Sequence, residues 1–363
     1  MPHDLLQRTC AAIAPLDATA LAAARHRQAQ LTKPAGSMGR LESLGEQLAG
    51  VYAVCPPPIP APVTVGVFAG DHGVHAQGVS PWPQEVTVQM VANVAAGGAV
   101  VSVLARQVGA TVVVCDVGVA GEVPEGLGVR DRRIAPGTAD FSDGPAMSVD
   151  ECELALAVGI EVAASSIDAG ARLLVTGDLG IGNTTASAAV IAAVTGRPAA
   201  DVTGPGAGSD AEMVAHKADV IGRALARHTP AGGWGTDRDS VVALLAAVGG
   251  FEHAALAGFM LGAAARRTPV LLDGVIACSA ALVAQALCPS VTDYLIAGHR
   301  SSEPGATVAL DRLGLEPVLD LGLRLGEGSG AVLAVPLVQA AARMLAEVAT
   351  FDSAGVSGRV DEG

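Results

Sequence analysis

The fold is predicted by one stretch of the chain, Arg172-Leu-Leu-Val-Thr-Gly-Asp-Leu-Gly-Ile-Gly-Asn-Thr-Thr-Ala-Ser187. Residues 173–176 form a short apolar run with a β-branched centre that ends in glycine, which is typical of a buried strand. A carboxylate, Asp178, follows where this strand ends. Gly180 and Gly182 then permit a tight turn in which backbone amides can lie close to a ligand. The stretch therefore predicts a strand that leads into a glycine turn.

A helix is predicted directly after this turn. Asn183, Thr184 and Thr185 are residue types that favour helix N-caps. Residues 186–194 then have helical character. A strand, a glycine turn and a helix N-terminus together make a natural anion site, because unpaired N–H groups and the helix dipole point at the same spot. The alternative is an ordinary strand–helix turn that happens to be rich in glycine.

Outside this stretch, predicted strands alternate with predicted helices. Strands are predicted at residues 63–69, 111–117, 172–177, 269–275 and 294–297, with a further candidate at 317–321. Helices are predicted at residues 85–107, 150–168, 185–195, 211–227, 241–249, 252–266, 279–286 and 332–348. This alternation implies an α/β fold with a mostly parallel, Rossmann-like sheet and helices on both of its faces.

The two ends of the chain have a different character. Residues 4–55 show helical spacing on either side of a loop at residues 33–40, and the proline-rich residues 55–62 form the clearest linker. At the other end, the tail after Phe351 is predicted to be disordered.

The composition limits the partners of the chain. The formal net charge of −14 argues against nucleic acid and anionic membranes, although a phosphate ligand needs only local donors. The six cysteines form no CxxC pair and have no metal-ligand spacing, so we expect reduced thiols in a cytoplasmic protein. No signal peptide is evident. The uncharged residues 274–292 are interpreted as a buried crossover helix and not as a membrane span.

Polar residues follow most of the predicted strands. In an open parallel sheet, ligands bind in the crevice beyond the carboxyl ends of the strands. Several carboxylates at one edge would also perturb one another's pKa values, which is usual in active sites. The alternative is that aspartate simply terminates strands well. The residues concerned are Asp71, His72, Asp116, Asp178, Asp273, His299 and Arg300.

Four motifs occur in order along the chain: Lys33-Pro-Ala-Gly-Ser37, Gly70-Asp-His-Gly-Val74, Gly177-Asp-Leu-Gly-Ile-Gly-Asn-Thr-Thr185 and Leu325-Gly-Glu-Gly-Ser-Gly-Ala331. Together they resemble the nicotinate-nucleotide–dimethylbenzimidazole phosphoribosyltransferases, which belong to cobalamin lower-ligand synthesis. The resemblance implies transfer of the ribosyl phosphate of nicotinate mononucleotide to a benzimidazole. The products would be α-ribazole phosphate and nicotinate, with inversion at the anomeric carbon.

The resemblance also implies the organisation of the protein. It implies a large α/β nucleotide-binding domain at residues 56–315, and a small helical domain, built from residues 1–55 and 316–363, that contributes the catalytic loop. It further implies a homodimer that acts on small molecules. The leaving pyridinium is already cationic and departs without a proton donor, so the reaction needs no metal or other cofactor, and the sequence shows no metal cluster.

For catalysis, the resemblance points to Glu327 as the general base that removes the azole proton as the new bond forms. Its flanking glycines let the backbone approach a ligand, and partial burial would raise the pKa of the carboxylate toward the working range. The alternative is a solvated loop glutamate. Asp178 is the second candidate carboxylate. Family members often carry glutamate at that position, which makes its role the weaker expectation of the two.

Binding residues are carried over to matching positions. The expected nucleotide contacts are Gly180, Ile181, Gly182, Asn183, Thr184, Gly204, Gly206, Lys217 and Ser301. The expected benzimidazole contacts are Ser80, Gln89 and Leu325, and Trp82 either stacks on the substrate or merely packs. Lys217 is one of only two lysines, and its alternative is a solvent-facing position on a helix.

Three alternative functions can be weighed against the residues of this sequence. A related transfer to adenine or a phenol would depend on ring-slot residues, which the sequence does not resolve. A catalytically idle nucleotide-binding protein would keep the glycine loops, and the presence of Glu327 argues against it. A dinucleotide-binding dehydrogenase is disfavoured because the first strand ends in Gly-Asp-His-Gly and not in a G-x-G-x-x-G turn.

Overall fold

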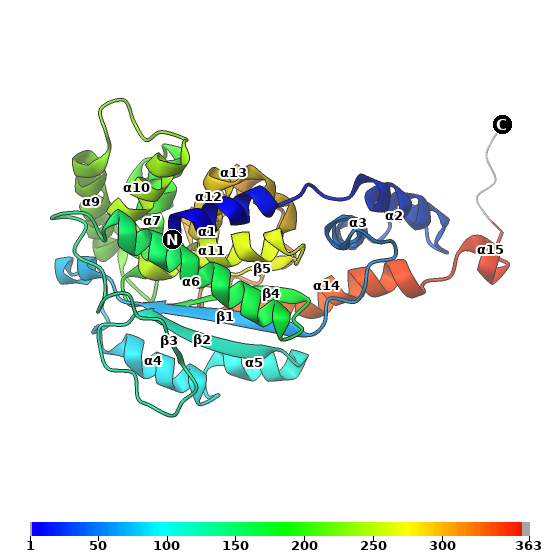
Figure 1. Cartoon of the computed structure of the whole chain (residues 1–363), viewed down its shortest axis with the longest axis horizontal. Coiled ribbons are helices and arrows are strands. Elements are labelled where there is room, and N and C mark those ends of the chain that lie inside the picture. The colour runs from blue at the N-terminus through cyan, green and yellow to red at the C-terminus, as the bar shows by residue number, and fades with distance from the viewer. Residues whose placement is uncertain (1, 358–363) are drawn as a thin grey trace.

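A six-stranded parallel sheet forms the centre of the molecule (Figure 1). The computed structural model describes residues 2–357. Across the sheet the strand order is β3-β2-β1-β4-β5-β6, which is a doubly wound, Rossmann-like order. The predicted fold class is therefore confirmed. The strands are β1 (Val63–Gly70), β2 (Thr111–Gly118), β3 (Arg130–Asp131), β4 (Leu173–Leu179), β5 (Val270–Leu272) and β6 (Leu295–Ala297).

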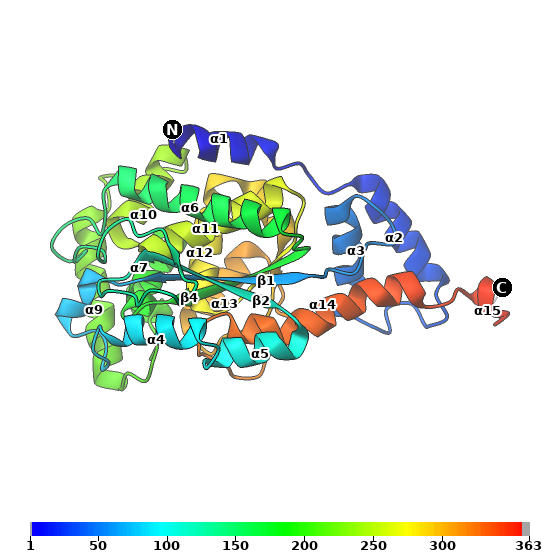
Figure 2. The same ribbon diagram turned by 60° about the horizontal axis from the view of Figure 1, so that its bottom comes forward.

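Helices cover both faces of this sheet (Figures 1 and 2). One face is covered by α4 (Val86–Ala95), α5 (Val100–Val108) and α14 (Ser329–Glu347), and α3 (Arg40–Tyr52) packs on α14. The other is covered by α1 (Pro2–Ala12), α6 (Val149–Asp168), α7 (Asn183–Thr195), α10 (Arg238–Val248), α11 (Phe251–Ala265), α12 (Val275–Leu287) and α13 (Pro304–Leu313). The remaining helices are α2 (Ala18–Gln30), α8 (Ala199–Val202), α9 (Ala211–His228) and α15 (Phe351–Ala354), with short 3-10 segments at Gly73–Gln77 and Pro289–Tyr294.

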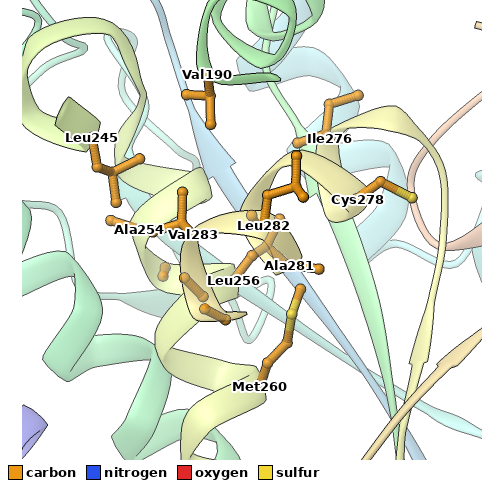
Figure 3. Packing of buried hydrophobic residues seen from close by; sticks show 14 of the residues in the cluster. Val190, Leu245, Ala254, Leu256, Met260, Ile276, Cys278, Ala281, Leu282 and Val283 are labelled. Atoms are coloured by element: carbon orange, nitrogen blue, oxygen red, sulfur yellow. The ribbon is translucent and has the colours of Figure 1, made fainter. Parts of the chain in front are cut away.

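Side chains of each strand alternate between two apolar cores. In β1, Val65 and Val67 point into the core under α4, α5 and α14, whereas Phe68 points into the core under α6 and α11. Phe68 meets Phe259 of α11 edge to face, with ring centroids 5.3 Å apart. Figure 3 shows this second core, in which aliphatic side chains of α11 and α12 pack together. Each such buried side chain contributes about 1.5–3 kcal/mol, so aliphatic burial compensates for the scarcity of aromatic residues.

Three predicted elements differ from the structure. The helix predicted at 85–107 is two helices, because Gly97 adopts a left-handed conformation with a φ of 84° between α4 and α5. The strand predicted at 269–275 is wrong beyond residue 272, since Val275 already begins α12, the expected crossover helix. The strand predicted at 317–321 is also wrong, because its pairing consists of an isolated bridge between Leu319 and His299.

Some elements were not predicted at all. They include β3 and α13, and α13 begins at Pro304 just beyond the last strand of the sheet. The predicted disordered tail is wrong at its start, because α15 is a short helix whose N-cap, Thr350, accepts a hydrogen bond from the Ser353 N–H. The rest of that prediction, at residues 358–363, lies outside the described residues.

The helices from the two chain ends lie at one end of the molecule. Figure 2 shows α14 running from the sheet out to α2 and α3, and these three helices pack together. In contrast, α1 lies against α6 and α11. The division into domains at residues 56 and 315 stays a prediction. Residues 86–108 and 329–347 are long and apolar enough to cross a membrane, but a break divides the first and more than half of the second is buried in the fold.

Candidate active site

A cavity of about 580 Å³ opens at the carboxyl ends of the strands, where the chain order reverses between β1 and β4. Such a switch point is where ligands bind in open α/β sheets. The cavity is lined by α4, by the turn after β4, by segments after β5 and β6, and by the loop before α14. The lining residues include Trp82, Val86, Thr87, Met90, Asp178, Gly180, Ile181, Asn183, Thr184, Gly206, Gly274, Ser301, Glu303, Leu323, Arg324, Leu325, Gly326 and Glu327.

Most of the predicted binding residues surround this cavity. Gly180, Ile181, Asn183, Thr184, Gly206, Ser301 and Leu325 line it directly. Ser80, Gly182 and Lys217 line an adjoining cavity of about 40 Å³. Gly204 contributes its carbonyl oxygen to the Lys217 ammonium group. Gln89 lies exposed on α4 and lines neither of these two cavities, so its contact with the ring stays a prediction.

Glu327 lies in a loop whose backbone is left-handed over three consecutive residues. The φ angles are 84°, 66° and 98° at Gly326, Glu327 and Gly328. Glycine adopts such angles freely, whereas a residue with a side chain does so at a cost of about 1–2 kcal/mol. The loop packs so closely on β4 that a Cβ atom at Gly177 would collide with the Glu327 carbonyl oxygen. The glycines therefore make possible a strained position that brings the Glu327 side chain to the cavity wall.

Asp273, a fully buried residue directly after β5, supports this loop. Its carboxylate accepts hydrogen bonds from the N–H groups of Gly328 (3.0 Å) and Ala331 (2.9 Å). His299 Nε2 lies 3.2 Å from the same carboxylate. Burial by itself would lower the pKa of His299, but Asp273 outweighs this effect and raises it. Asp273 therefore caps α14 and fixes the residues that precede it.

Glu327 is a buried acid, with 6% of its surface exposed. The Val101 N–H at the start of α5 donates to Glu327 Oε2 over 3.4 Å. Burial raises the pKa of Glu327, this hydrogen bond opposes the increase, and the charge of Asp273 adds to it. A carboxylate with a raised pKa is a better general base near neutral pH than one in water. The burial excludes the alternative of a solvated loop glutamate.

Asp178 is the penultimate residue of β4 and lines the same cavity. The side chain of Asn183 donates to Asp178 Oδ2 over 2.9 Å, whereas Oδ1 is buried without a hydrogen-bond partner among the described residues. Burial, followed by the charges of three neighbouring carboxylates, raises the pKa of Asp178 well above its ordinary value. Those neighbours are Asp273, Glu252 and Glu327. The cavity thus brings together the two predicted carboxylates from different elements.

Lys217 is buried, which excludes the solvent-facing alternative. Its Nζ donates to Thr184 Oγ1 and to the Gly204 carbonyl oxygen, each over 3.1 Å. Burial lowers the pKa of Lys217, and the neighbouring Glu303 carboxylate opposes this. Glu303 in turn accepts a 2.8 Å hydrogen bond from the Gly206 N–H. Lys217 therefore ties the turn after β4 to the glycine-rich loop at residues 204–208, which we call the second loop.

Two side chains bridge to this second loop from other sides of the cavity. Arg324 donates to the Gly206 carbonyl oxygen over 2.6 Å. The indole N–H of Trp82 donates to the Ala207 carbonyl oxygen over 2.9 Å, and the side chain remains 48% exposed. Both residues thereby position the second loop as part of the cavity wall.

Sequence reasoning missed three polar residues of the cavity wall: Thr87, Glu303 and Arg324. Two of them had a usable signal. Glu303 follows Ser301 by two residues, and Arg324 directly precedes the motif that contains Glu327. Thr87 had none, because it lies within a predicted helix whose orientation the sequence does not specify.

His72, Glu252 and His253 form a fully buried cluster, with each residue 0% exposed. His72 packs against Gly182 of the turn after β4. Glu252 Oε1 accepts a hydrogen bond from His72 Nε2 and makes an ion-pair contact with His253 Nδ1, each at 2.7 Å. These separations are shorter than the distance of about 3.3 Å expected between two ligand atoms on one zinc ion. Burial by itself would raise the pKa of Glu252, but the two histidines lower it. We interpret the cluster as a buried ionic network.

Other strand-end residues lie away from the cavity. Asp116 accepts hydrogen bonds from the N–H groups of Gly118 (3.0 Å) and Val119 (2.8 Å) and pairs with Arg133 beside a separate cavity. Its role is therefore the strand-terminating one. Asp178 is the strand-end carboxylate that reaches the main cavity.

Known proteins match this chain over nearly its whole length. A family model described as phosphoribosyltransferase matches residues 13–356. A relative from Salinispora tropica, named nicotinate-nucleotide–dimethylbenzimidazole phosphoribosyltransferase, is 57% identical over 97% of this chain and 99% of its own length. A relative of the same name from Roseiflexus sp. (strain RS-1) is 54% identical over 99% of both chains.

A solved structure matches as well. The crystal structure of CobT from Thermus thermophilus superimposes with a TM-score of 0.89 at 46% identity, covering 94% of this chain and 100% of that one. With the family model and the relatives, this likeness covers the sheet, the glycine turn and the loop of Glu327 together. The chain belongs to the nicotinate-nucleotide–dimethylbenzimidazole phosphoribosyltransferase family.

Proposed function

We propose that the chain transfers the phosphoribosyl group of nicotinate mononucleotide to dimethylbenzimidazole. The products are α-ribazole 5′-phosphate and nicotinate, with inversion at the anomeric carbon. The names of the relatives state a nicotinate nucleotide and dimethylbenzimidazole. One observation carries the proposal: Glu327 is a buried carboxylate in the same cavity as the uncapped N-terminus of α7.

The chemistry is a single displacement at the anomeric carbon. The azole nitrogen attacks this carbon, and the bond to the pyridinium nitrogen breaks, so that its electron pair makes the departing nicotinate ring neutral. The azole becomes cationic in the same step, and the proton on its second nitrogen passes to Glu327. A positioned base of this kind contributes about 10²–10⁴-fold to the rate. Attack on the face opposite the leaving group accounts for the inversion.

The nucleotide phosphate is assigned to the turn after β4. The N-cap of α7 is Gly182, with a φ of 96°, and no side chain among residues 2–357 caps this end of the helix. An uncapped N-terminus attracts anions through its free N–H groups and the helix dipole. Lys217 adds a positive charge beside Thr184. Ser301, which lines the same cavity after β6, is assigned to the rest of the nucleotide.

The benzimidazole is assigned to the apolar part of the wall. Val86 and Met90 of α4, together with Leu323 and Leu325 of the loop before Glu327, supply this part. A flat apolar ring gains by leaving water in such a slot. The ring would then lie between α4 and the loop that carries the base.

Asp178 is assigned a supporting role. Burial and the neighbouring carboxylates raise its pKa well above the ordinary value, so Asp178 holds a proton more tightly than a carboxyl group in water does. Asn183 already donates to Oδ2, so the unpartnered Oδ1 is the atom that can donate a hydrogen bond to a substrate oxygen. In this role Asp178 holds the substrate while Glu327 moves the proton.

We also propose that the enzyme works as a cytoplasmic homodimer. Val100 and Val103 of α5 are 47% and 50% exposed, and Leu321 and Leu325 beside the cavity are 60% and 55% exposed. Val100 and Val103 are three residues apart on α5 and share one face of this helix, and such an exposed apolar face supports a protein–protein interface. Light scattering on the purified chain should give the mass of two copies, and a monomer at micromolar concentration would contradict the proposal.

The activity is tested by incubating the purified protein with nicotinate mononucleotide and a panel of azoles, purines and phenols. Chromatography measures the release of nicotinate, and NMR of the product gives its anomeric configuration. We expect preferred transfer to dimethylbenzimidazole with an α product. Binding of the nucleotide without any nicotinate release would instead indicate an idle nucleotide-binding protein, and preferred transfer to a purine or phenol would overturn the assigned acceptor.

A further inference from the structure

The motif Gly70-Asp-His-Gly73 follows β1 and lines neither the main cavity nor the small one, so the chemistry above gives it no role. Its two polar residues, Asp71 and His72, are 1% and 0% exposed. Burying ionisable side chains costs free energy unless they are hydrogen-bonded or paired. Their partners therefore indicate what the motif does.

Asp71 reaches the turn after β4 through Thr87. The Thr87 hydroxyl donates to Asp71 Oδ1 over 2.7 Å, and the same hydroxyl oxygen accepts a hydrogen bond from the Ile181 N–H over 3.0 Å. The Ala120 N–H donates to the other oxygen of Asp71 over 2.9 Å. A hydroxyl has a single hydrogen, so Thr87 can hold Ile181 and Asp71 together only in this direction.

His72 supports the same turn from its buried side. A Cβ atom at Gly182 would lie 3.3 Å from His72 Cβ, so the turn backbone packs against this side chain. Glu252 fixes the imidazole through a 2.7 Å hydrogen bond. His253, the next residue of α11, lies 2.8 Å from Ser187 Oγ in α7, the helix that the turn begins. The turn and its helix are thus tied to one buried network.

We infer that Asp71 and His72 are positioning residues for the nucleotide-binding turn, and that Thr87 is the link through which Asp71 acts. The inference rests on the proposed function, because the turn matters as the site of the phosphate. The link also occupies the Ile181 N–H, so this amide is not one of the phosphate donors. A displacement of about 1 Å at a binding element is enough to weaken function strongly, which makes such support necessary.

The test compares Thr87→Val with Thr87→Ser. Valine keeps the shape of threonine but can neither accept from Ile181 nor donate to Asp71. We expect the Kd of nicotinate mononucleotide, measured by calorimetry, and its KM to rise about 10-fold, with kcat within about 3-fold of wild type. Serine keeps the hydroxyl and should return Kd and KM to within about 2-fold.

Ser187→Ala tests the buried network that contains His72, because Ser187 contacts His253, which contacts Glu252, the partner of His72. Ser187 lines neither of the two cavities. This variant should raise the Kd of the nucleotide about 3-fold with kcat unchanged. The matched control for Thr87→Val is Thr9→Val, because the Thr9 hydroxyl donates to the Leu5 carbonyl oxygen within α1, away from the turn (2.8 Å). This control should lower the melting temperature and leave Kd at the wild-type value.

The outcomes separate the inference from the proposed function. If Thr87→Val lowers stability as Thr9→Val does but leaves Kd unchanged, or if Thr87→Ser fails to restore binding, Thr87 is purely structural and the inference is overturned. An unchanged Kd in Ser187→Ala overturns the His72 branch. A wild-type protein that binds the nucleotide without releasing nicotinate defeats the proposed function, while the Kd comparison still decides the inference. A wild-type protein that does not bind it overturns both.

Discussion

Two glycine-rich segments of this molecule lead into helices, yet they offer opposite chemistry to the cavity. The turn at residues 180–183 begins α7, and the loop at residues 326–328 begins α14. Their N-caps are both left-handed glycines, Gly182 and Gly328, with φ of 96° and 98°. Within the described part of the chain, the first helix end has no side-chain cap, whereas the carboxylate of Asp273 caps the second.

This difference shows how one local pattern serves two purposes. An open helix N-terminus stabilises an anion, which suits a phosphate site. The same end would also stabilise a nearby Glu327 carboxylate and make it a weaker base. Because Asp273 satisfies the N-terminus of α14, burial and the Asp273 charge instead raise the pKa of Glu327. A buried acid from the neighbouring strand therefore converts a potential anion site into the position of a general base.

The largest effect is expected from Glu327→Gln, which removes the base but keeps the size of the side chain. Turnover should fall about 10²–10⁴-fold, while the Kd of nicotinate mononucleotide changes little, because the other glycine segment holds the nucleotide. Steady-state kinetics and calorimetry measure the two quantities. The exposed Glu316→Gln serves as the control. Turnover close to the wild-type value would remove Glu327 from the mechanism.

A smaller effect is expected from Asp273→Asn. An amide keeps one acceptor oxygen, so one of the two N–H groups of α14 loses its partner, at a cost of about 1–3 kcal/mol in the free energy of unfolding. The loosened loop should lower kcat about 10- to 100-fold.

The control for this variant is Asp116→Ala, because Oδ1 of Asp116 accepts both backbone N–H groups at its strand end and alanine removes this acceptor. Urea unfolding should show a similar loss of stability, with kcat unchanged. Equal losses of kcat in the two variants would mean that Asp273 does not act through the loop of Glu327.

At the N-terminus of α7, Gly182→Ala should weaken binding of the nucleotide. Left-handed strain of about 1 kcal/mol corresponds to a KM for the nucleotide about 5-fold higher, with kcat within about 2-fold. Gly196→Ala, at the other end of α7, imposes similar strain, because Gly196 has a φ of 70° and open space around it. It should lower stability without changing KM. A KM that rises equally in both variants would argue against an anion site at the turn.

The smallest effect concerns pH. A base must be deprotonated, so kcat at saturating substrate should fall as the pH drops through the raised pKa of Glu327, beginning at a higher pH than an ordinary carboxyl would give. In Asp273→Asn the missing charge should lower the pKa of Glu327 and move this decline to lower pH. A pH profile that stays in place, or moves upward, would contradict the coupling between the two acids.

The features built from consecutive residues, in both glycine-rich segments, could be predicted from the sequence. The strand, the turn and the start of α7 are consecutive residues, and glycines flank Glu327 directly. The capping of α14 could not be predicted, because Gly328 and Asp273 are 55 residues apart and meet only once β5 lies beside β4. The same holds for Thr87, whose link to the turn depends on how α4 is rotated.

The errors have equally physical causes. An apolar run such as residues 269–275 does not reveal whether it is a strand or the start of a buried helix, and here it is both. Gln89 is a different case: it is exposed, a motif does not state which way a helical side chain points, and its contact with the ring stays a prediction.

The most direct test of the assigned base is a crystal structure of Glu327→Gln with nicotinate mononucleotide and dimethylbenzimidazole bound unreacted. We predict the phosphate at residues 180–184, and the azole N–H within about 2.6–3.2 Å of the side-chain oxygen of residue 327. An azole N–H that faces Asp178 or solvent, with the side chain of residue 327 turned toward the Val101 N–H, would contradict the assignment of the base.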